Sequence, residues 1–382
     1  MKPHLTVVTG SRAEFYLMLP VIKKLQISPK VILNIVVIGG HFDVSMKESL
    51  KDIKTSVNAP INLIPINPKN DESTDISNQV SATISQFSKW LVSNKCDMIL
   101  VLGDRHEILG VCTTALIHRI PIAHIHGGDV SEGAIDESIR HSITKMATYH
   151  FPATKLSKLR ILQMGEIPDY VIDTGSLGVE NAQNNSYLGQ AILKKPYTLL
   201  TCHPETILGP ADINKQQDSL YDALMEYSGK VLITRSNFDE GGELIYKKHQ
   251  KWVLKNPQKF QLVNNLGNSF HANLQKADFC IGNSSSALIE APALKTPSIN
   301  IGVRQKGRER GNSVVQCAWS KNEIIDAIEL CLDSQWLKQN DRFSSPYQCR
   351  KIKPSDIIVD KLIDYLVHPA PSKIFQMKPS EV

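Results

Sequence analysis

The stretch IPIAHIHGGDVSEGAIDESIRHSITKM, residues 120–146, contains the unit from which the fold can be predicted. Its first six residues form an apolar run of the length typical of a buried strand, and a Gly-Gly pair follows. Beyond Gly133, Ile135, Ile139 and Ile143 would lie on one side of a helix. A buried strand that leads into an amphipathic helix is the repeating unit of a parallel sheet covered by helices.

The same unit recurs in both halves of the chain. Further apolar runs that we expect to be strands span residues 5–8, 34–38 and 98–102 in the first half, and 197–201, 230–234, 278–281 and 297–301 in the second. An Asn-rich, weakly periodic segment over 178–196 separates the halves, and we interpret it as a linker. We therefore expect an α/β protein with two Rossmann-like domains, over 1–177 and 197–355, that face each other across a cleft. A terminal helix and tail would occupy 356–382.

Composition is that of an ordinary globular protein. The chain has 382 residues, 42% of them hydrophobic and 21% charged, which is enough apolar material for two cores. The net charge of +5 is mild and basic residues are mixed with acidic ones, so we expect no nucleic-acid partner. No apolar run has the length of a membrane span, and the first residues lack a signal-peptide pattern, so we expect a cytoplasmic protein. Seven scattered cysteines without a CxxC pair favour reduced thiols.

Polar residues cluster where the predicted strands end. The clusters are Ser11-Arg12, Asp104-Arg105, His126 to Asp129, His203 to Glu205, and Gly282 to Ser286. In open α/β sheets, ligands bind beyond the carboxyl ends of the strands, where loops and helix N-termini converge. We therefore expect the functional residues to come from these clusters.

The segment GNSSSALIE, residues 282–290, is a candidate phosphate site because it follows a strand and opens a helix. Backbone N–H groups and the hydroxyls of Ser284, Ser285 and Ser286 could bind phosphate oxygens, and Glu290 could bind a ribose diol. The alternative is a serine helix cap followed by a solvated glutamate.

Arginines add to the case for a phosphate ligand. Arg12 lies in TGSRAE, another strand-to-helix turn, which has no GxGxxG motif, and Arg308 lies in the basic segment 304–310. Ordinary surface arginines remain the alternative for Arg308. Together with the serines, these residues favour a nucleoside diphosphate.

Two aspartates are candidates for acid/base chemistry. Asp104 ends a predicted strand, and the alternative is that it caps the next helix. Asp136 lies at the start of the helix after the Gly-Gly loop, four residues before Arg140, and Glu137 lies four before His141. The alternative is that both pairs are surface salt bridges, which contribute little.

Histidines suggest either a metal site or proton transfer. His124 and His126 alternate along a predicted strand, so they would share one face, and Asp129 follows. No further ligand pair has metal-site spacing, so we expect no metal and interpret one of the two as a core histidine. His203, before a proline at a strand end, is a weak candidate by itself.

Taken in order, these motifs resemble the UDP-N-acetylglucosamine 2-epimerase family, which has a two-domain GT-B-like fold. The resemblance rests on GSRAE, VLGDR, HIHGGD with AIDESIRHSITK, CHPET and GNSSSALIEAPALKTPSINIGVRQKGR, from residue 5 to about 315. The chain looks most like the hydrolysing branch of the bacterial sialic-acid pathway, because non-hydrolysing members have glutamate in place of His126 and lysine in place of Leu17. Many hydrolysing relatives read HIHGGE, so Asp129 is one carbon shorter here.

The resemblance implies that UDP-GlcNAc and water give ManNAc and UDP through a glycal, with no redox cofactor and no metal required. The residues expected to carry the chemistry are Asp104, Asp129, Asp136, His126 and His203. Those expected to bind the UDP-sugar are Arg12, Arg140, Ser284, Ser285, Ser286, Glu290 and Arg308. A homodimer or homotetramer is also implied.

Three alternatives stay open at this point. The first is a hydrolysing 2-epimerase for UDP-N,N'-diacetylbacillosamine on the route to legionaminic acid, since both reactions share the UDP and C2 chemistry. The second is a GT-B glycosyltransferase, which would leave the configuration at C2 unchanged. The third is a UDP-sugar sensor without turnover.

Overall fold

The computed structural model describes residues 2–42, 47–66, 73–131, 135–185, 189–205, 209–236, 241–348 and 351–371. The chain divides into two units. The first unit consists of Met1–Asp129, Ile135–Leu177 and Cys349–Val382, and the second consists of Val130–Ala134 and Gly178–Gln348. Among the described helices, none is long and apolar enough to cross a membrane.

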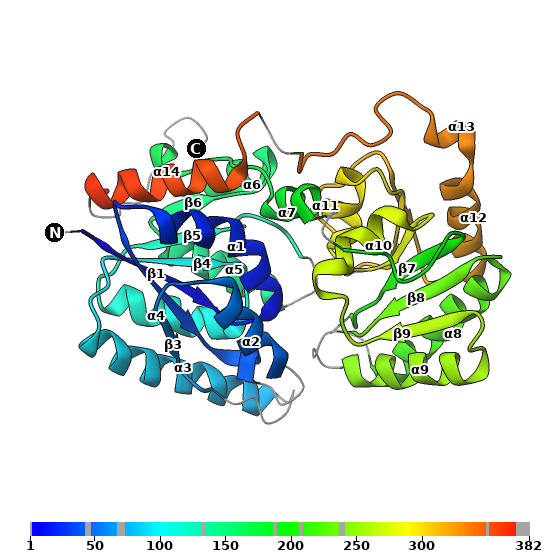
Figure 1. Ribbon diagram of the computed structural model, residues 1–382, viewed down its shortest axis with the longest axis horizontal. Helices are drawn as coiled ribbons and strands as arrows, with labels where there is room; N and C mark the ends of the chain where they lie inside the picture. Colours follow the sequence, from blue (N-terminus) through cyan, green and yellow to red (C-terminus); the bar gives the residue numbers. More distant parts are fainter. Residues whose placement is uncertain are drawn as a thin grey trace, which may run out of the picture. The chain divides into compact units, whose positions relative to one another are not determined.

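The first unit contains a six-stranded parallel sheet within the described residues (Figure 1). Its strands are β1 His4–Thr9, β2 Ile32–Val37, β3 Ile61–Leu63, β4 Met98–Leu102, β5 Ile122–Ile125 and β6 Tyr149–Phe151. They lie in the order β3-β2-β1-β4-β5-β6. The chain builds outward from β1 to one edge and returns to the other side at β4, so the strand order reverses between β1 and β4. Such a switch point is where open α/β sheets bind ligands.

The second unit repeats this arrangement. Its described strands are β7 Tyr197–Thr201, β8 Lys230–Thr234, β9 Phe260–Val263, β10 Cys280–Gly282, β11 Ser298–Ile301 and β12 Val314–Cys317, in the order β12-β11-β10-β7-β8-β9. All neighbouring strands are parallel. The switch point lies between β7 and β10. Two sheets of Rossmann type confirm the expected fold class.

Helices cover both faces of the first sheet (Figure 1). The helical segments of this unit are α1 Arg12–Ile27, η1 Gly39–Phe42, α2 Lys47–Ser56, α3 Ser73–Ser93, α4 His106–Ile117, α5 Ile135–Met146, α6 Lys155–Gln163, η3 Pro168–Tyr170 and α14 Pro354–Val367. Along β1, Leu5 and Val7 point toward a core shared with α1 and α14, while Val8 points toward α3, α4 and α5. A sheet buried on both faces gives continuous apolar runs, which is why its central strands were readable from the sequence.

The helix α14 is last in the chain but packs in the first unit. Its Ile358, Leu362 and Tyr365 belong to the same core as α1, and Lys24 on α1 contacts Asp356. The helix expected from residue 356 begins at Pro354, where a proline is favoured because the first helical N–H needs no partner.

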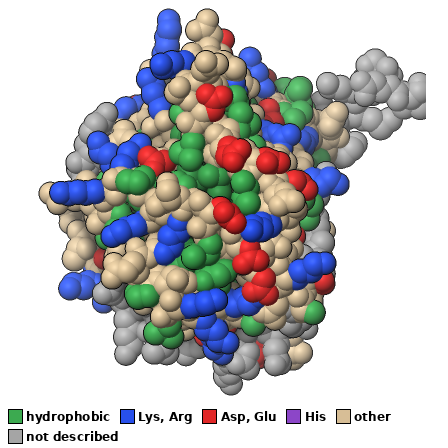
Figure 2. Space-filling model, turned by 90° about the vertical axis from the view of Figure 1, so that its right-hand side faces the viewer, with side chains coloured by type: hydrophobic (Ala, Val, Ile, Leu, Met, Phe, Trp, Pro, Cys, Tyr) green, Lys and Arg blue, Asp and Glu red, His purple; other side chains and the backbone are tan. Residues whose placement is uncertain are grey.

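The second unit has its main core between the sheet and α8, α9 and α12. Its helical segments are α8 Pro210–Glu226, α9 Gly242–Lys255, η4 Gly267–Ser269, α10 Phe270–Lys276, α11 Ser286–Ala293, α12 Lys321–Leu332 and α13 Ser334–Leu337. On the face shown in Figure 2, Lys and Arg side chains are mixed with Asp and Glu, as the sequence suggested.

Helix α7, Leu177–Asn185, occupies the first part of the segment expected to be a linker. Its Val179 and Ala182 are fully buried, and Glu180 and Asn181 are buried beside them. Packing of this face overrides the low helix propensity of the asparagines. The first part of the segment that looked like a connection by composition is therefore a packed helix.

Candidate active site

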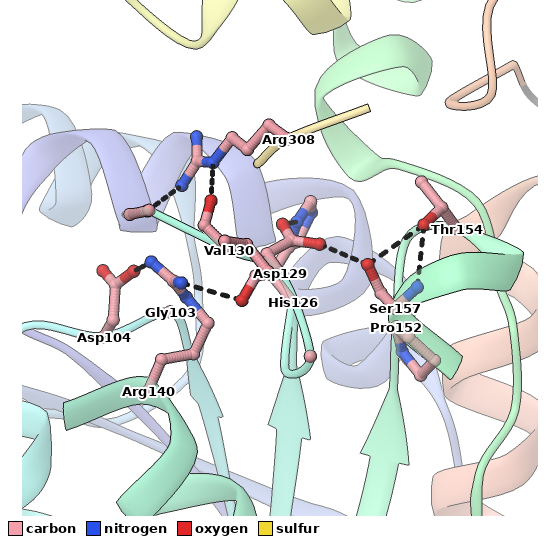
Figure 3. A network of polar contacts seen from close by, with 12 residues as sticks. Gly103, Asp104, His126, Asp129, Val130, Arg140, Pro152, Thr154, Ser157 and Arg308 are labelled. Atoms are coloured by element: carbon pink, nitrogen blue, oxygen red, sulfur yellow. Dashed lines mark hydrogen bonds and ion pairs between the residues drawn. The ribbon is translucent and has the colours of Figure 1, made fainter. Parts of the chain in front are cut away.

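The central residue of the site in the first unit is Arg140 on α5 (Figure 3). Its side chain is only 1% exposed, and it donates hydrogen bonds to the Asp104 carboxylate, to the Asp129 carbonyl at 2.9 Å and to Glu137 Oε2 at 3.0 Å. Burial opposes the charge, but Asp104, Asp129 and Glu137 together raise the pKa of Arg140 above its ordinary value. Arg140 thus links the ends of β4 and β5 through a permanent positive charge.

Asp104 faces this guanidinium and does not cap a helix. The N-cap of α4 is Arg105, which makes no side-chain capping bond, so the capping alternative for Asp104 is wrong. The surface-salt-bridge alternative is also wrong for Arg140, because its side chain is buried. The predicted Glu137–His141 pair is confirmed, at 3.0 Å between Oε1 and Nε2. Asp136 lies half-buried in the first turn of α5.

His126 follows the end of β5 with a left-handed backbone, at φ of +63°. Its Nδ1 lies 3.4 Å from Asp129 Oδ2, and the Ser157 hydroxyl donates to Asp129 Oδ1 at 2.7 Å. Gly128 lets the loop pass close to α6, since a Cβ there would lie 2.3 Å from the Ser157 carbonyl oxygen. The short side chain of Asp129 therefore reaches both a histidine and a serine.

His124 is separate from His126. It is fully buried, its Nε2 lies 2.7 Å from the Gly103 carbonyl oxygen, and burial lowers its pKa to about 3. The expectation that both share one face is wrong, because β5 ends at Ile125 and the turn at His126 breaks the alternation. The interpretation of one as a core histidine is confirmed for His124. Within the described part of the chain, no group of three His, Cys, Asp or Glu side chains is placed to hold a metal.

Arg12, expected to bind phosphate, is paired within the first unit. It donates to Asp52 Oδ2 on α2 at 2.7 Å, and Tyr16 donates to the same oxygen at 3.0 Å. The side chain of Arg12 remains 18% exposed, at the first residue of α1 beside the switch point. A diphosphate would therefore compete with Asp52 for this guanidinium.

A buried carboxylate pair at the same switch point was not predicted. Glu14 Oε2 accepts a hydrogen bond from the Gly10 N–H at 2.8 Å, and burial raises the pKa of Glu14 to about 8 against the opposing charge of Arg105. Arg105 donates to both oxygens of Glu107, each at 3.1 Å. The Ser-x-x-Glu spacing of Ser11 and Glu14 is a helix-start signature that pointed to Glu14.

In the second unit, His203 and Asn283 join the two strands at the switch point. The His203 N–H donates to Asn283 Oδ1, and Asn283 Nδ2 donates to the His203 carbonyl oxygen, both at 2.8 Å. Gly282 allows this approach, because its φ is +135° and a Cβ there would lie 2.0 Å from the Thr201 carbonyl oxygen. The HPE segment and the serine segment are thereby held side by side.

The predicted phosphate segment opens α11. Ser285 is the N-cap residue and makes no side-chain capping bond, but the Ser284 hydroxyl accepts from the Ser286 N–H at 3.4 Å, as the serine-cap alternative expects. Ser286 Oγ donates to Ser284 Oγ at 3.0 Å. Glu290 is half-buried on the same helix, and burial raises its pKa to about 7. The helix N-terminus supplies N–H donors and a positive dipole end for an anion.

Glu205 anchors the segment that carries the basic residues; the sequence placed it in the strand-end cluster His203 to Glu205 but indicated no role for it. It is buried, and its Oε1 accepts from the N–H groups of Val303 at 2.8 Å and Arg304 at 3.3 Å and from Trp319 Nε1 at 3.2 Å. The sequence signal for Glu205 was its position directly after His203 and Pro204, at the end of a strand. Further along the same segment lies Arg308.

Arg308 is engaged, contrary to the alternative of an ordinary surface arginine. Its Nε donates to the Val130 carbonyl oxygen at 3.1 Å and its Nη2 to Ser131 Oγ at 3.2 Å, and residues 130 and 131 group with the second unit (Figure 3).

Comparison with known proteins identifies related sequences over most of the chain. The family described as UDP-N-acetylglucosamine 2-epimerase matches residues 23–355. The polysialic acid biosynthesis protein P7 of Escherichia coli is 36% identical over 349 residues, 89% of each chain. A Campylobacter jejuni protein named GDP/UDP-N,N'-diacetylbacillosamine 2-epimerase (hydrolyzing) is 36% identical over 371 residues, 94% of each chain.

Solved structures share the fold. A UDP-GlcNAc 2-epimerase from Neisseria meningitidis, bound to UDP-GlcNAc, has a TM-score of 0.77 at 20% identity and covers 95% of this chain and 100% of its own. Staphylococcus aureus MnaA, bound to UDP, has a TM-score of 0.78 at 20% identity and covers 99% of this chain and 100% of its own. These similarities confirm the expected GT-B-like fold class.

Proposed function

We propose that this chain, which belongs to the UDP-N-acetylglucosamine 2-epimerase family, converts UDP-GlcNAc and water to ManNAc and UDP. The observation that carries this conclusion is the Asp104 carboxylate held by buried Arg140 at the end of β4, in one network with Asp129 and His126. That network supplies a fixed carboxylate and an imidazole in neighbouring loops of one switch point. Both groups are suited to moving protons.

The chemistry requires such groups. The hydrogen on C2 of the sugar is barely acidic, so the bond from C1 to the UDP oxygen must break before or while that hydrogen leaves. A carboxylate takes the C2 proton, UDP departs with the bonding electrons, and a glycal with a C1–C2 double bond remains. Water then adds its oxygen to C1, and a proton returns to C2 on the opposite face. Groups that bind the diphosphate stabilise the charge that grows on it.

We assign proton transfer at C2 to Asp104 and Asp136. Arg140 favours the ionised form of the Asp104 carboxylate by attraction and fixes its orientation. Asp136 lies at the amino end of the helix that carries Arg140. His203 is assigned to protonation or to holding the diphosphate from the second unit, where Asn283 fixes its backbone.

The UDP group is assigned to the serine segment and the arginines. The N-terminus of α11 with Ser284, Ser285 and Ser286 would bind phosphate oxygens, and Glu290 would accept hydrogen bonds from the ribose. Arg12 and Arg308 would add positive charge to the diphosphate, exchanging their present partners for it.

A second substrate is favoured by a specific observation. The Campylobacter jejuni relative named for UDP-N,N'-diacetylbacillosamine is as similar to this chain as the polysialic acid protein, so the pathway is either sialic acid or legionaminic acid synthesis. Membership of the epimerase family sets the glycosyltransferase and sensor alternatives aside. A cytoplasmic homodimer or homotetramer completes the proposal, and light scattering after gel filtration tests the assembly.

Proton NMR of each sugar nucleotide in D2O tests the function. With UDP-GlcNAc we expect free ManNAc with deuterium at C2 and released UDP. Consumption of only the bacillosamine nucleotide moves the substrate to the legionaminic acid route, and no change with either nucleotide contradicts the proposal.

Variants test the residue roles in the same assay. Asp104→Asn and Asp136→Asn should each lower kcat by about 10² to 10⁴. The matched control is Asp97→Asn, because Asp97 lies directly before β4, at the opposite end of the strand from Asp104. Its kcat should be nearly that of the wild type. Near-normal turnover of both site variants contradicts the assignment.

A further inference from the structure

An imidazole has two different nitrogens, so its use in proton transfer depends on which one carries the hydrogen. In the neutral ring one nitrogen donates and the other accepts. A carboxylate beside one nitrogen fixes the hydrogen there, because an ionised carboxylate only accepts. His126 has such a neighbour in Asp129, whose Oδ2 lies 3.4 Å from Nδ1.

Asp129 is itself held in place. Ser157 Oγ donates to Asp129 Oδ1 at 2.7 Å, and Ser157 Oγ lies 3.0 Å from Thr154 Oγ1 at the start of α6 (Figure 3). The positive charge of Arg140 attracts the Asp129 carboxylate. One oxygen of Asp129 accepts from a donor on α6, and the other lies within hydrogen-bond distance of His126.

The remaining nitrogen of His126 has an unusual environment. Nε2 is inaccessible to solvent and has no hydrogen-bond partner among the described residues. A buried polar atom without a partner is costly and needs an explanation. The backbone of His126 adds a second cost, since a non-glycine residue with φ of +63° is strained. The unpartnered nitrogen and the strained backbone both occur at the end of a strand, where ligands of this fold bind.

We propose that Asp129 and Ser157 are positioning residues: Asp129 fixes the hydrogen of neutral His126 on Nδ1, so that Nε2 acts as the base in glycal hydration, and Ser157 orients Asp129. This inference rests on the proposed function. As the water oxygen bonds to C1, Nε2 takes a proton from that water and the ring becomes an imidazolium. The Asp129 carboxylate balances the new charge, and the imidazolium then returns the proton to the carboxylate that supplied the proton of C2.

The tautomer can be measured without substrate. The protein is labelled with ¹⁵N in the histidine rings, and long-range ¹H–¹⁵N correlation identifies the protonated nitrogen of each ring above its titration. His126→Asn assigns the signal, because asparagine tolerates a left-handed backbone. We expect Nδ1–H for wild-type His126, whereas an unrestrained ring prefers Nε2–H. An Nε2–H ring in the wild type overturns the proposal.

Variants test the two positioning residues. Asp129→Ala should shift the ring to Nε2–H and lower kcat at least tenfold. Ser157→Ala should keep Nδ1–H but lower kcat three- to tenfold with KM within twofold. Ser142→Ala is the matched control, because its hydroxyl donates only within α5 to the Ser138 carbonyl oxygen and should change neither readout.

The outcomes separate the two proposals. A wild-type protein that consumes neither sugar nucleotide contradicts the proposed function, whatever the tautomer. A protein that turns over substrate but keeps Nδ1–H in Asp129→Ala, or keeps full kcat in Ser157→Ala, overturns the positioning roles and leaves the function intact.

Discussion

Replacing Arg140 by methionine should destabilise the first unit by ~3 kcal/mol. Methionine is unbranched and similar to arginine in volume, so the variant mainly removes a charge and three hydrogen bonds and leaves little empty volume. Loss of one partner from a buried ion pair costs about 3–5 kcal/mol. Asp104 and Glu137 are 25% and 26% exposed, so water partly replaces the guanidinium at both and places the cost at the lower end. The Asp129 carbonyl oxygen also loses its donor.

Scanning calorimetry measures this effect. In a domain of this size, 1 kcal/mol corresponds to about 2–4 °C, so the melting transition of the first unit should fall by roughly 6–12 °C. Arg160→Met is the matched control, because Arg160 is half-buried and donates to the Gly128 carbonyl oxygen of the same loop at 3.2 Å. This variant should lower the melting transition by less than about 4 °C. Asp104→Asn combined with Arg140→Met should recover part of the loss, since it removes the unpaired charge. If Arg140→Met melts no lower than Arg160→Met, the reasoning fails.

Three glutamates give further predictions. The pKa of Glu14 is about 8 in the folded protein and 4.5 in the unfolded chain, so the free energy of unfolding of the wild type should fall as pH rises from 4.5 to about 8. Glu14→Gln should not show this fall and should gain up to ~5 kcal/mol relative to the wild type in urea titrations. An equal pH dependence of both proteins would argue against a neutral Glu14. Glu205→Ala should weaken UDP binding at least tenfold in calorimetry and Glu205→Gln less than threefold, because glutamine keeps an oxygen for the Val303 and Arg304 N–H groups. Wild type should bind UDP more tightly than 2',3'-dideoxy-UDP; Glu290→Ala should abolish that difference, and its persistence excludes the ribose role.

The sequence predicted the central strands and missed the edges. The eight expected strands form the inner strands of both sheets, and the described strands not foreseen are β3, β6, β9 and β12, which are the edges. Inner strands are apolar on both faces and give readable runs. The edge strands have only three or four residues, and β3, β9 and β12 also expose part of their length, so neither a run nor an alternation develops.

Those features of the site that depend on neighbouring residues in the sequence were predictable. Strand-end position drew attention to Asp104, His126 and Asp129, which the structure places in one polar network, and helical spacing gave the Glu137–His141 pair. Arg140, in contrast, pairs with Asp104, 36 residues away. Glu205 binds an N–H group 98 residues along the chain. Neither contact follows from spacing, because it depends on which strands become neighbours in the sheet.

The place of α14 in the first unit affects how the protein is made. Its apolar side completes the core against α1, yet it leaves the ribosome only after the whole second sheet. The ~180 residues between Leu177 and Pro354 take roughly 10–35 s to synthesise at about 5–20 residues per second. During that time the nascent first unit exposes the surface that α14 later covers, which makes it a client for chaperones. A premature stop shortly before Pro354 would make this exposure permanent, and damage the part of the protein that was made first.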